Sequence, residues 1–444
     1  MTQRALVVVG LLLVSLAGLT LTGRSVFGSL SVLFAGVLFV AWAWSWAALR
    51  GLRLERTSRS LTSQVGRVFE ESLSLENDSR LPKLWVEVRD QSDLPGSWAT
   101  ARAIGLSTQI GMPDFSGHRA SAVAAGLGAR QSWLWTARTI CTRRGRFRLG
   151  PTTLIASDPF GLFPSRRKVG GVREVVVLPP TVPLPAFPIP AGRLVGGEAL
   201  RRRTYQVTPN ASGVREYAHG DSLSRIHWKS TARRDRLISK EFELDPMSDV
   251  WIVLDGQRQM HCGEAAAEEM LGGKVLGRPL RLPPQTEEYM IAAAASVALH
   301  VLRHNRATGL LGYGTSRMVI QPERGEAQLF RILEALAGFR ADGDVDLTDV
   351  FHVEMTWLPR GATIAVLTPN VRPDLLHEIL ELRRRGLVPV ASFVEPSDFG
   401  SRVSSRPLAL ALSEAGIPVR VIRRRQSLEQ SLSQPAGGVR RDAA

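Results

Sequence analysis

The stretch from residue 215 to residue 243 holds the side chains of this sequence that are best suited to chemistry. His219, Asp221 and His227 are of the types that bind transition metals or transfer protons near neutral pH. The two histidines stand eight positions apart, with a glycine and an expected helix start between them. This spacing fits no common metal-ligand pattern. We therefore expect neither a metal site nor a catalytic residue here.

A structural role explains the same residues better. Asp221 is a good N-cap for a helix that runs through SLSRIHWKSTARR. On that helix an acid and three cations recur every four positions and form one charged stripe: Asp221, Arg225, Lys229 and Arg233. We expect the three cations either to lock two domains together, by pairing with Asp221, Glu241 and Glu243, or to present a surface to a partner protein.

Nucleic-acid binding is a further alternative for this stretch. Arginines beside Trp228 resemble the basic and aromatic surfaces that bind single strands. Acidic residues follow at once and cancel this charge locally: Glu241, Glu243 and Asp245. The net charge of +15 indicates an anionic partner, but the arginines are spread along the chain, which suits anionic lipid. We therefore expect no nucleic-acid partner.

Asp255 ends a continuous apolar run and is followed by a glycine. Such a run predicts a buried parallel strand, and ligands bind where parallel strands end. A von Willebrand factor A domain holds Mg²⁺ at this place with Asp-x-Ser-x-Ser, a later Thr and a later Asp. Here Gln257 and Gln259 replace the serines. Arg258 adds a positive charge, and Asn370 stands near where the later acid is needed.

We therefore expect a degenerate site at Asp255, with no bound metal and no cofactor. The carboxylate is expected to bind backbone N–H groups or an arginine. The alternative is a magnesium-dependent enzyme, or an adhesion-type binding domain, that uses Asp255.

Two apolar segments, residues 5–22 and 26–49, open the chain and contain no charge. As helices each is about long enough to cross a hydrocarbon layer of roughly 30 Å. Three tryptophans and three arginines at the end of the second segment indicate an interfacial belt and a cytoplasmic flank: Trp42, Trp44, Trp46, Arg50, Arg53 and Arg56. The positive-inside rule predicts a helical hairpin over residues 1–50 in the cell membrane, with both termini cytoplasmic. The free thiols expected for Cys141 and Cys262 agree with a reducing compartment.

The chain after the hairpin begins with short strands. Residues 54–180 alternate between apolar and polar side chains and contain Gly and Pro turns, which predicts a small β-sandwich. Within it, residues 105–128 are rich in small side chains and are expected to form a loop. Residues 181–210 are rich in proline and arginine and predict an extended linker.

The stretch 211–246 leads into a different pattern. In residues 247–425, strands alternate with helices, which predicts a doubly wound α/β domain with a parallel sheet. Residues 257–284 interrupt this alternation as an irregular insertion. Residues 426–444 are expected to be a disordered tail.

The stretch 217–233, YAHGDSLSRIHWKSTAR, resembles the signature of a bacterial and archaeal family called domain of unknown function 58. The pieces RRGRFRLGP at 143–151 and SDPFGLF at 157–163 resemble two further motifs of that family. The resemblance extends over nearly the whole chain. Its signature positions are the predicted interaction residues: Tyr217, Gly220, Asp221, Arg225, His227, Trp228, Lys229 and Arg233.

The resemblance implies a von Willebrand factor A-like C-terminal domain and no enzymatic activity. It also implies a partner, because such proteins are commonly encoded beside MoxR-type AAA+ ATPases. They are thought to act with these ATPases in the folding, assembly or metal loading of other proteins, or in envelope and stress functions. We therefore predict a membrane-anchored cytoplasmic interaction protein that works with an ATPase of this type.

Overall fold

The computed structural model describes residues 2–94, 118–188, 211–217, 226–242, 249–263, 273–275, 278–280 and 282–435. The chain forms two compact units. Unit 1 comprises residues 1–182, 262–296 and 330–340, and unit 2 comprises residues 183–261, 297–329 and 341–444. Each unit is therefore assembled from segments that are separated in the sequence.

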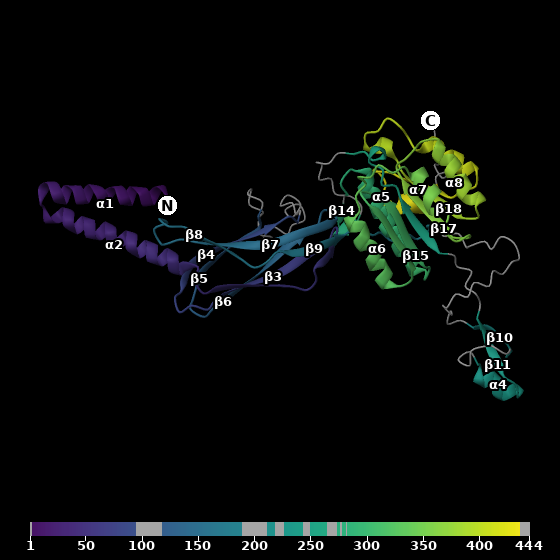
Figure 1. The fold of residues 1–444 in the computed structure, drawn as a ribbon, viewed down its shortest axis with the longest axis horizontal. Coiled ribbons are helices and arrows are strands. Elements are labelled where there is room, and N and C mark those ends of the chain that lie inside the picture. Colours follow the sequence, from purple (N-terminus) through teal and green to yellow (C-terminus); the bar gives the residue numbers. More distant parts are fainter. Residues whose placement is uncertain are drawn as a thin grey trace. The chain divides into compact units, whose positions relative to one another are not determined.

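Unit 1 begins with a hairpin of two long helices, α1 (Gln3–Thr22) and α2 (Ser25–Ala48), which lie side by side (Figure 1). Their mean hydropathy values are 2.4 and 2.2, and both are long and apolar enough to cross a membrane. Gly23 ends α1 in the left-handed conformation and donates its N–H to the carbonyl of Leu19. This glycine cap lets the chain reverse within two residues, as the short polar break predicts.

The rest of unit 1 contains two β-sheets that share a core. One sheet has the order β1-β3-β6, with bounds Leu52–Ser58, Val68–Asn77 and Ser132–Ile140. The other has the order β2-β9-β7-β4-β5, with bounds Thr62–Gln64, Arg173–Leu178, Gly145–Ala156, Lys83–Ser92 and His118–Leu127. A further strand, β8 (Ser165–Val169), pairs with β7. Alternate residues of the strands are buried, and Leu75 of one sheet packs in a cluster with Val86 and Leu154 of the other. The predicted sandwich is thus present as two sheets around one core.

One sequence expectation is wrong within this sandwich. Part of the stretch 105–128, which we expected to be a loop, is strand β5, paired antiparallel with β4. In this strand Ala124 and Leu127 are buried, while Val123 and Ala125 are exposed. Residues 95–117 lie outside the described part of the chain.

Unit 2 contains a six-stranded sheet of order β16-β15-β12-β17-β18-β19. The bounds in that order are Arg317–Glu323, Thr308–Tyr313, Val250–Leu254, Thr363–Thr368, Val388–Val394 and Val419–Ile422. Every neighbouring pair is parallel except β15–β16. The prediction of a wholly parallel sheet is wrong at this edge, because the turn between Tyr313 and Arg317 is too short for a crossover helix.

Four helices of the C-terminal half, α5, α6, α8 and α9, follow the predicted alternation, and α7 and α10 were not predicted. The helices, with their bounds, are α5 (Thr286–Arg303), α6 (Glu326–Gly338), α7 (Leu347–Glu354), α8 (Asp374–Arg384), α9 (Arg406–Glu414) and α10 (Leu428–Ser433), with short 3₁₀ turns η2 (Arg258–Met260) and η3 (Pro396–Phe399). Residues of α7, α8 and α9 form one apolar cluster with β12, β17 and β18. All residues of β12 and β17 are buried, as central strands require.

Helix α10 corrects the prediction of a disordered tail from residue 426. Ser427 caps this helix by accepting a hydrogen bond from the N–H of Gln430. Leu428 and Leu432, one turn apart, are both buried. Two leucines on one face supply the apolar contact that stabilises this short helix. The polar composition of the segment had favoured a disordered tail instead. Residues 436–444 lie outside the described part.

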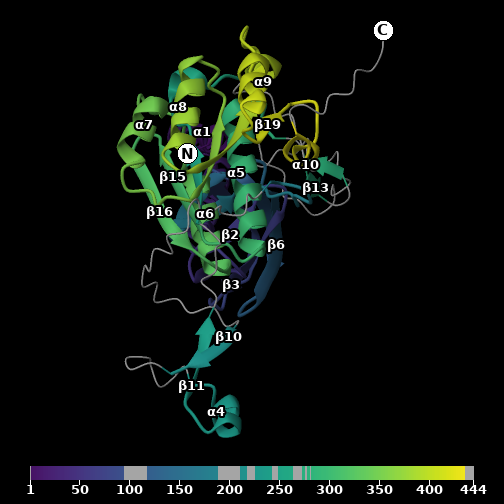
Figure 2. The same ribbon diagram turned by 90° about the vertical axis from the view of Figure 1, so that its right-hand side faces the viewer.

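Two small hairpins complete the described chain. Strands β10 (Ala211–Glu216) and β11 (Ile238–Phe242) pair antiparallel and carry helix α4 (Trp228–Arg234), as Figure 2 shows. In the expected insertion, β13 (Gly273–Val275) pairs with β14 (Arg278–Leu280). The insertion is therefore not wholly irregular.

Candidate functional site

The carboxylate of Asp255 lies at the end of the central strand β12 and is 1% exposed. One oxygen accepts a hydrogen bond from the hydroxyl of Thr368, at 2.6 Å. The other accepts from the backbone N–H of Gln257, at 3.0 Å. Thr368 is the last residue of the neighbouring parallel strand β17, so the sheet register brings the two side chains together. Asp255, Gln257, His261, Thr368, Asn370 and Arg372 are called the strand-end site below.

Two basic side chains lie near this carboxylate. The Nε2 atom of His261 lies 3.0 Å from the carbonyl oxygen of Asp255. Arg372 forms an ion pair with Asp346 and also attracts the Asp255 carboxylate. Burial raises the pKa of Asp255 above its ordinary range, while His261, the hydrogen bond from Thr368, the N–H of Gln257 and Arg372 act in the opposite direction.

Backbone segments pack closely around the site. The N–H of Gly343 donates to the carbonyl of Gly256 at 2.9 Å, and Arg258 donates to Gly343 at 2.8 Å. A side chain at Gly256 would place its first carbon 1.8 Å from the carbonyl oxygen of Tyr313. Only glycine fits there, so the loop after β12 is held rigidly against the end of β15.

Two buried amide groups of the site have an atom that finds no hydrogen-bond partner among the residues that the structure describes. Gln257 is 7% exposed and Asn370 1%, and the unpaired atoms are Oε1 of Gln257 and Nδ2 of Asn370. The other amide atom of Asn370, Oδ1, accepts from the N–H of Arg372. An unpaired buried amide costs about 1–3 kcal/mol. The strand-end site therefore retains one acceptor and one donor that a ligand or water can satisfy.

Helix α4, in the described part of the signature stretch, places three large side chains in solvent. Trp228 is 66% exposed, and Lys229 and Arg233 are exposed on the same helix, α4. Tyr217 donates its N–H to the carbonyl of Leu237 at 2.9 Å and so fixes the base of the β10–β11 hairpin.

The predicted N-cap Asp221 lies outside the described residues, but the predicted helix does not run unbroken through Ile226 and His227, because α4 begins at Trp228. His227 is the N-cap residue, and its Nδ1 atom accepts from the N–H of Ser230 at 3.2 Å. Ile226 pairs with Ser239 instead of continuing a helix. His219, Gly220, Asp221, Arg225 and Glu243 lie outside the described residues, as does the side chain of Glu241. The charged lock thus stays a prediction.

Residues 213–398 match the model of the family described as "Protein of unknown function DUF58". We call this matching stretch the DUF58 region. It begins within β10 and includes α4 and the whole strand-end site. A similar curated protein is the "Uncharacterized protein YeaD" of Bacillus subtilis (strain 168), 24% identical over 169 residues. That alignment covers 38% of this chain and 36% of YeaD, so the chain matches about a third of the relative's length.

Solved structures resemble the chain only over parts of it. The CARDB domain of a Pyrococcus furiosus protein aligns with 28% of this chain and 91% of its own, at 12% identity and a TM-score of 0.18. Proximal thread matrix protein 1 of the mussel byssus aligns with 42% of this chain and 45% of its own, at 11% identity and a TM-score of 0.28. These likenesses are too low to support an argument about function.

The donor set of the DUF58 region does not fit Mg²⁺. This ion requires oxygen ligands in an octahedron, with carboxylates to balance its charge. Asp255 already accepts two hydrogen bonds, and the nearby charged groups include Arg372 and His261. Gln257 and Asn370 add amides in place of a hydroxyl and an acid. Among the residues that the structure describes, no three His, Cys, Asp or Glu side chains gather as metal ligands do.

The raised pKa of Asp255 makes a prediction about pH. The folded chain binds this proton more tightly than the unfolded chain, so the contribution to stability is present below the ordinary value of 3.8 and is lost as pH rises through the folded pKa. We expect Asp255→Asn to remove that loss. The free energy of unfolding of the full chain in detergent micelles is measured and compared with that of the variant. The difference should fall as pH rises above the ordinary value of 3.8 and through the folded pKa of Asp255. Asp342→Asn, in an exposed position of the neighbouring loop, serves as control. Equal pH slopes for wild type and Asp255→Asn would contradict the prediction.

Sequence reasoning missed one buried charged residue, Arg144, which precedes β7 in the motif RRGRFRLGP. Its side chain is 1% exposed and pairs with Glu287 and Glu288 in the first turn of α5. It also donates to the carbonyl of Leu336 at 3.1 Å and to that of Phe339 at 2.8 Å, at the end of α6. All five residues belong to unit 1. The sequence indicates that Glu287 and Glu288 begin a helix. No local pattern indicates that Arg144 is the arginine that pairs with them.

Proposed function

We propose that this chain is a membrane-anchored interaction protein that works with a MoxR-type AAA+ ATPase and has no catalytic activity of its own. The strand-end site carries the proposal. Its one buried acid, Asp255, is already bound by Thr368 and Gln257, so it is poorly placed to act as a base, nucleophile or metal ligand. What the site leaves unsatisfied is hydrogen-bonding capacity on Gln257 and Asn370, which suits recognition.

The anchor in this proposal is the α1–α2 hairpin. Its helices have the length and hydropathy of membrane spans. Arg50 and Arg53 follow α2 directly, and the positive-inside rule then favours a cytoplasmic body and cytoplasmic termini. An interaction protein held in this way would gather its partner, and the partner's clients, at the inner face of the cell membrane.

The interaction domain is proposed to be von Willebrand factor A-like. Strand β12, which carries Asp255 at its end, is central in the sheet, and β16 is the one antiparallel member of the order given above. In a domain of this type, partners bind at the carboxyl ends of the strands. Here the contact would form without a shared metal ion.

The partner surface is proposed to include helix α4. An exposed tryptophan with neighbouring cations is the kind of residue set that dominates protein interfaces. Trp228, Lys229 and Arg233 provide that set, and they lie within the family signature. Their exposure in the described chain agrees with a surface kept for a partner, and a MoxR-type ATPase is the partner that the family resemblance implies.

Affinity purification of the tagged full chain from native membranes tests the proposal. We expect an AAA+ ATPase to co-purify, and the double substitution Trp228→Ala, Lys229→Glu to reduce its recovery at least about tenfold. Arg384→Glu is the control. Arg384 is exposed on α8 and forms an ion pair with Glu381 on the same helix. Absence of an ATPase from the wild-type sample would contradict the proposed partnership with a MoxR-type ATPase.

A melting experiment tests the non-catalytic part separately. We expect Mg²⁺ to leave the melting temperature of the purified chain unchanged. A rise in melting temperature with Mg²⁺ that Asp255→Asn abolishes would instead support a metal-dependent activity at Asp255.

A further inference from the structure

The loop formed by residues 157–164, between β7 and β8, is held in one conformation by a buried acid. Asp158 is 2% exposed and accepts hydrogen bonds from the N–H groups of Phe160, at 2.9 Å, and Phe163, at 2.7 Å. Gly161 adopts φ of +67°, which lets the loop turn tightly. We call this segment the interface loop. It is a rigid projection of the sandwich within unit 1.

The interface loop binds to the sides of the helical hairpin. Leu162 is buried in a cluster with Ala5 of α1 and Ala41 of α2. The hydroxyl of Ser45 donates to the carbonyl of Phe163 at 2.6 Å, and that of Thr2 donates to the carbonyl of Leu162 at 2.9 Å. The loop therefore contacts the flanks of both helices and not only the end of α2.

These contacts fix the depth of the loop. Ala41 stands seven residues before Ala48, where α2 ends, which is about 10 Å along the helix. The 24 residues of α2 span about 36 Å, more than a hydrocarbon layer of about 30 Å. The excess of about 6 Å lets about one turn of α2 reach the headgroup layer, and the three tryptophans near Ala48 mark this end as the interfacial one. The interface loop lies beside this end of α2.

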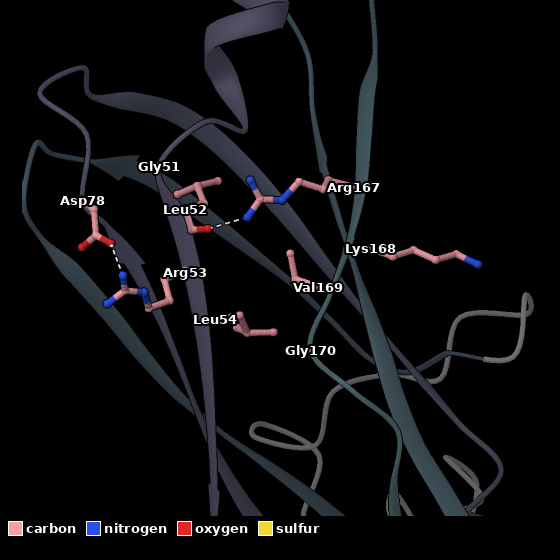
Figure 3. A pocket seen from close by; sticks show the side chains of 9 residues that line it. All are labelled: Gly51, Leu52, Arg53, Leu54, Asp78, Arg167, Lys168, Val169 and Gly170. Carbon is pink, nitrogen blue, oxygen red and sulfur yellow. Dashed lines mark hydrogen bonds and ion pairs between the residues drawn. The ribbon is translucent and has the colours of Figure 1, made fainter.

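The junction between α2 and the sandwich is firmly connected. Lys83 donates to the carbonyl of Ala47 at 2.8 Å. Arg167 donates to the carbonyl of Leu49 at 3.0 Å and to that of Leu52, as the dashed line in Figure 3 marks for Leu52. These cations donate hydrogen bonds to carbonyl groups at the C-terminal end of α2, where the helix itself provides no donors. The loop cannot move away from the membrane surface without breaking these bonds.

The loop exposes an apolar tip, and exposed arginines lie on the segments that it contacts or leads into. Pro159 is exposed, and Phe160 is 51% exposed although its backbone is fixed. The guanidinium of Arg4 lies next to Gly161, and that of Arg50 stacks on the ring of Trp46 at 3.1 Å. Arg166, on the strand that leaves the loop, is exposed. The nearby Asp78 is already paired with Arg53.

We propose that the interface loop is a lipid-binding element of the cytoplasmic leaflet. Phe160 inserts among the headgroups, and Arg4, Arg50 and Arg166 contact the phosphates of anionic phospholipids. An aromatic tip flanked by cations is the arrangement that binds such an interface. The proposal rests on the proposed membrane span of α1 and α2. It adds a second, peripheral contact that fixes the orientation of the sandwich at the bilayer.

Spin-label accessibility tests this in the full chain, reconstituted in nanodiscs of equal parts phosphatidylglycerol and phosphatidylcholine. Cys262 is replaced by serine, whereas Cys141 is buried and is kept. A label at Phe160→Cys is expected to be severalfold less accessible to an aqueous nickel reagent than one at Val172→Cys. Val172 is a matched control, because it is apolar, 58% exposed and lies beyond the far end of β8.

A third label, at Leu13→Cys in the middle of α1, separates the two proposals. If label 13 is protected in lipid but labels 160 and 172 are equally accessible to nickel, the lipid-binding loop is overturned and the anchor stands. If label 13 is also accessible to nickel, the proposal that α1 spans the membrane is contradicted. In nanodiscs of phosphatidylcholine alone we expect weaker protection at position 160, and unchanged protection would overturn the role of the three arginines.

Discussion

Replacing Arg144 by alanine is expected to lower the free energy of unfolding by about 3–5 kcal/mol, because it leaves buried charges without a partner. The side chain of Glu288 is 8% exposed and that of Glu287 16%, and both carboxylates bind this guanidinium. Two carbonyls at the end of α6, those of Leu336 and Phe339, would also lose their donor. The effect is measured by urea unfolding of the full chain in detergent micelles.

Arg146→Ala is the matched control for this prediction. Arg146 stands two residues along the same segment and pairs with Glu174 and Glu334, but its side chain is 56% exposed. Exposed pairs of this kind contribute about 0–1 kcal/mol. Equal losses from the two substitutions would show that burial of Arg144 is not what makes it important. Arg144→Lys should remain well below wild type in stability, since an ammonium group cannot reproduce the planar fork that meets two acids and two carbonyls.

Gly256→Ala is expected to destabilise unit 2 by at least about 3 kcal/mol, because overpacking against backbone cannot be relieved by a rotamer change. The added carbon would lie 1.8 Å from the carbonyl oxygen of Tyr313 and 3.0 Å from the N–H nitrogen of Gly314. The loop after β12 must shift, and Asp255 and Gln257 must shift with it. Thermal unfolding monitored by tryptophan fluorescence measures the loss.

Gly338→Ala provides the comparison for Gly256. It lies at the end of α6, and an added carbon there meets no atom within 4 Å. Substitution at such a position is expected to be neutral or to stabilise by about 0.4–1 kcal/mol, through the unfolded state. A Gly256→Ala variant as stable as Gly338→Ala would mean that the strand-end loop has more room than its contacts indicate.

The sequence was informative wherever one segment determines its own structure. The hairpin could be predicted because Gly23 and Arg24 interrupt two long apolar runs. The strand and helix alternation after residue 247 could be predicted from the change in hydrophobic period. Strand β16 and helix α7 were not, because their residues alternate weakly and their identity depends on the partner elements, β15 and α8.

In the candidate site, too, features set within one segment could be predicted and features set by distant segments could not. Asp255 could be selected because it ends an apolar strand, but its partner Thr368 is 113 residues away and is set by the neighbourhood of β12 and β17. No local pattern encodes which strands become neighbours. His227 illustrates a smaller error of this kind. The polar residue at Asp221 suggested a cap, whereas the pairing of Ile226 with Ser239 delays the helix and makes His227 the cap instead.

The Arg144 cluster also bears on how the chain is made. The carbonyl that accepts its longest-range hydrogen bond belongs to a residue 195 positions later. At about 5–20 residues per second, a ribosome needs roughly 10–40 seconds to supply that segment after Arg144 has emerged. During this interval the hairpin and most sandwich strands already exist, while the arginine has neither its acids nor its carbonyls. The nascent sandwich therefore remains incomplete until the segment that contains α5 and α6 has been synthesised.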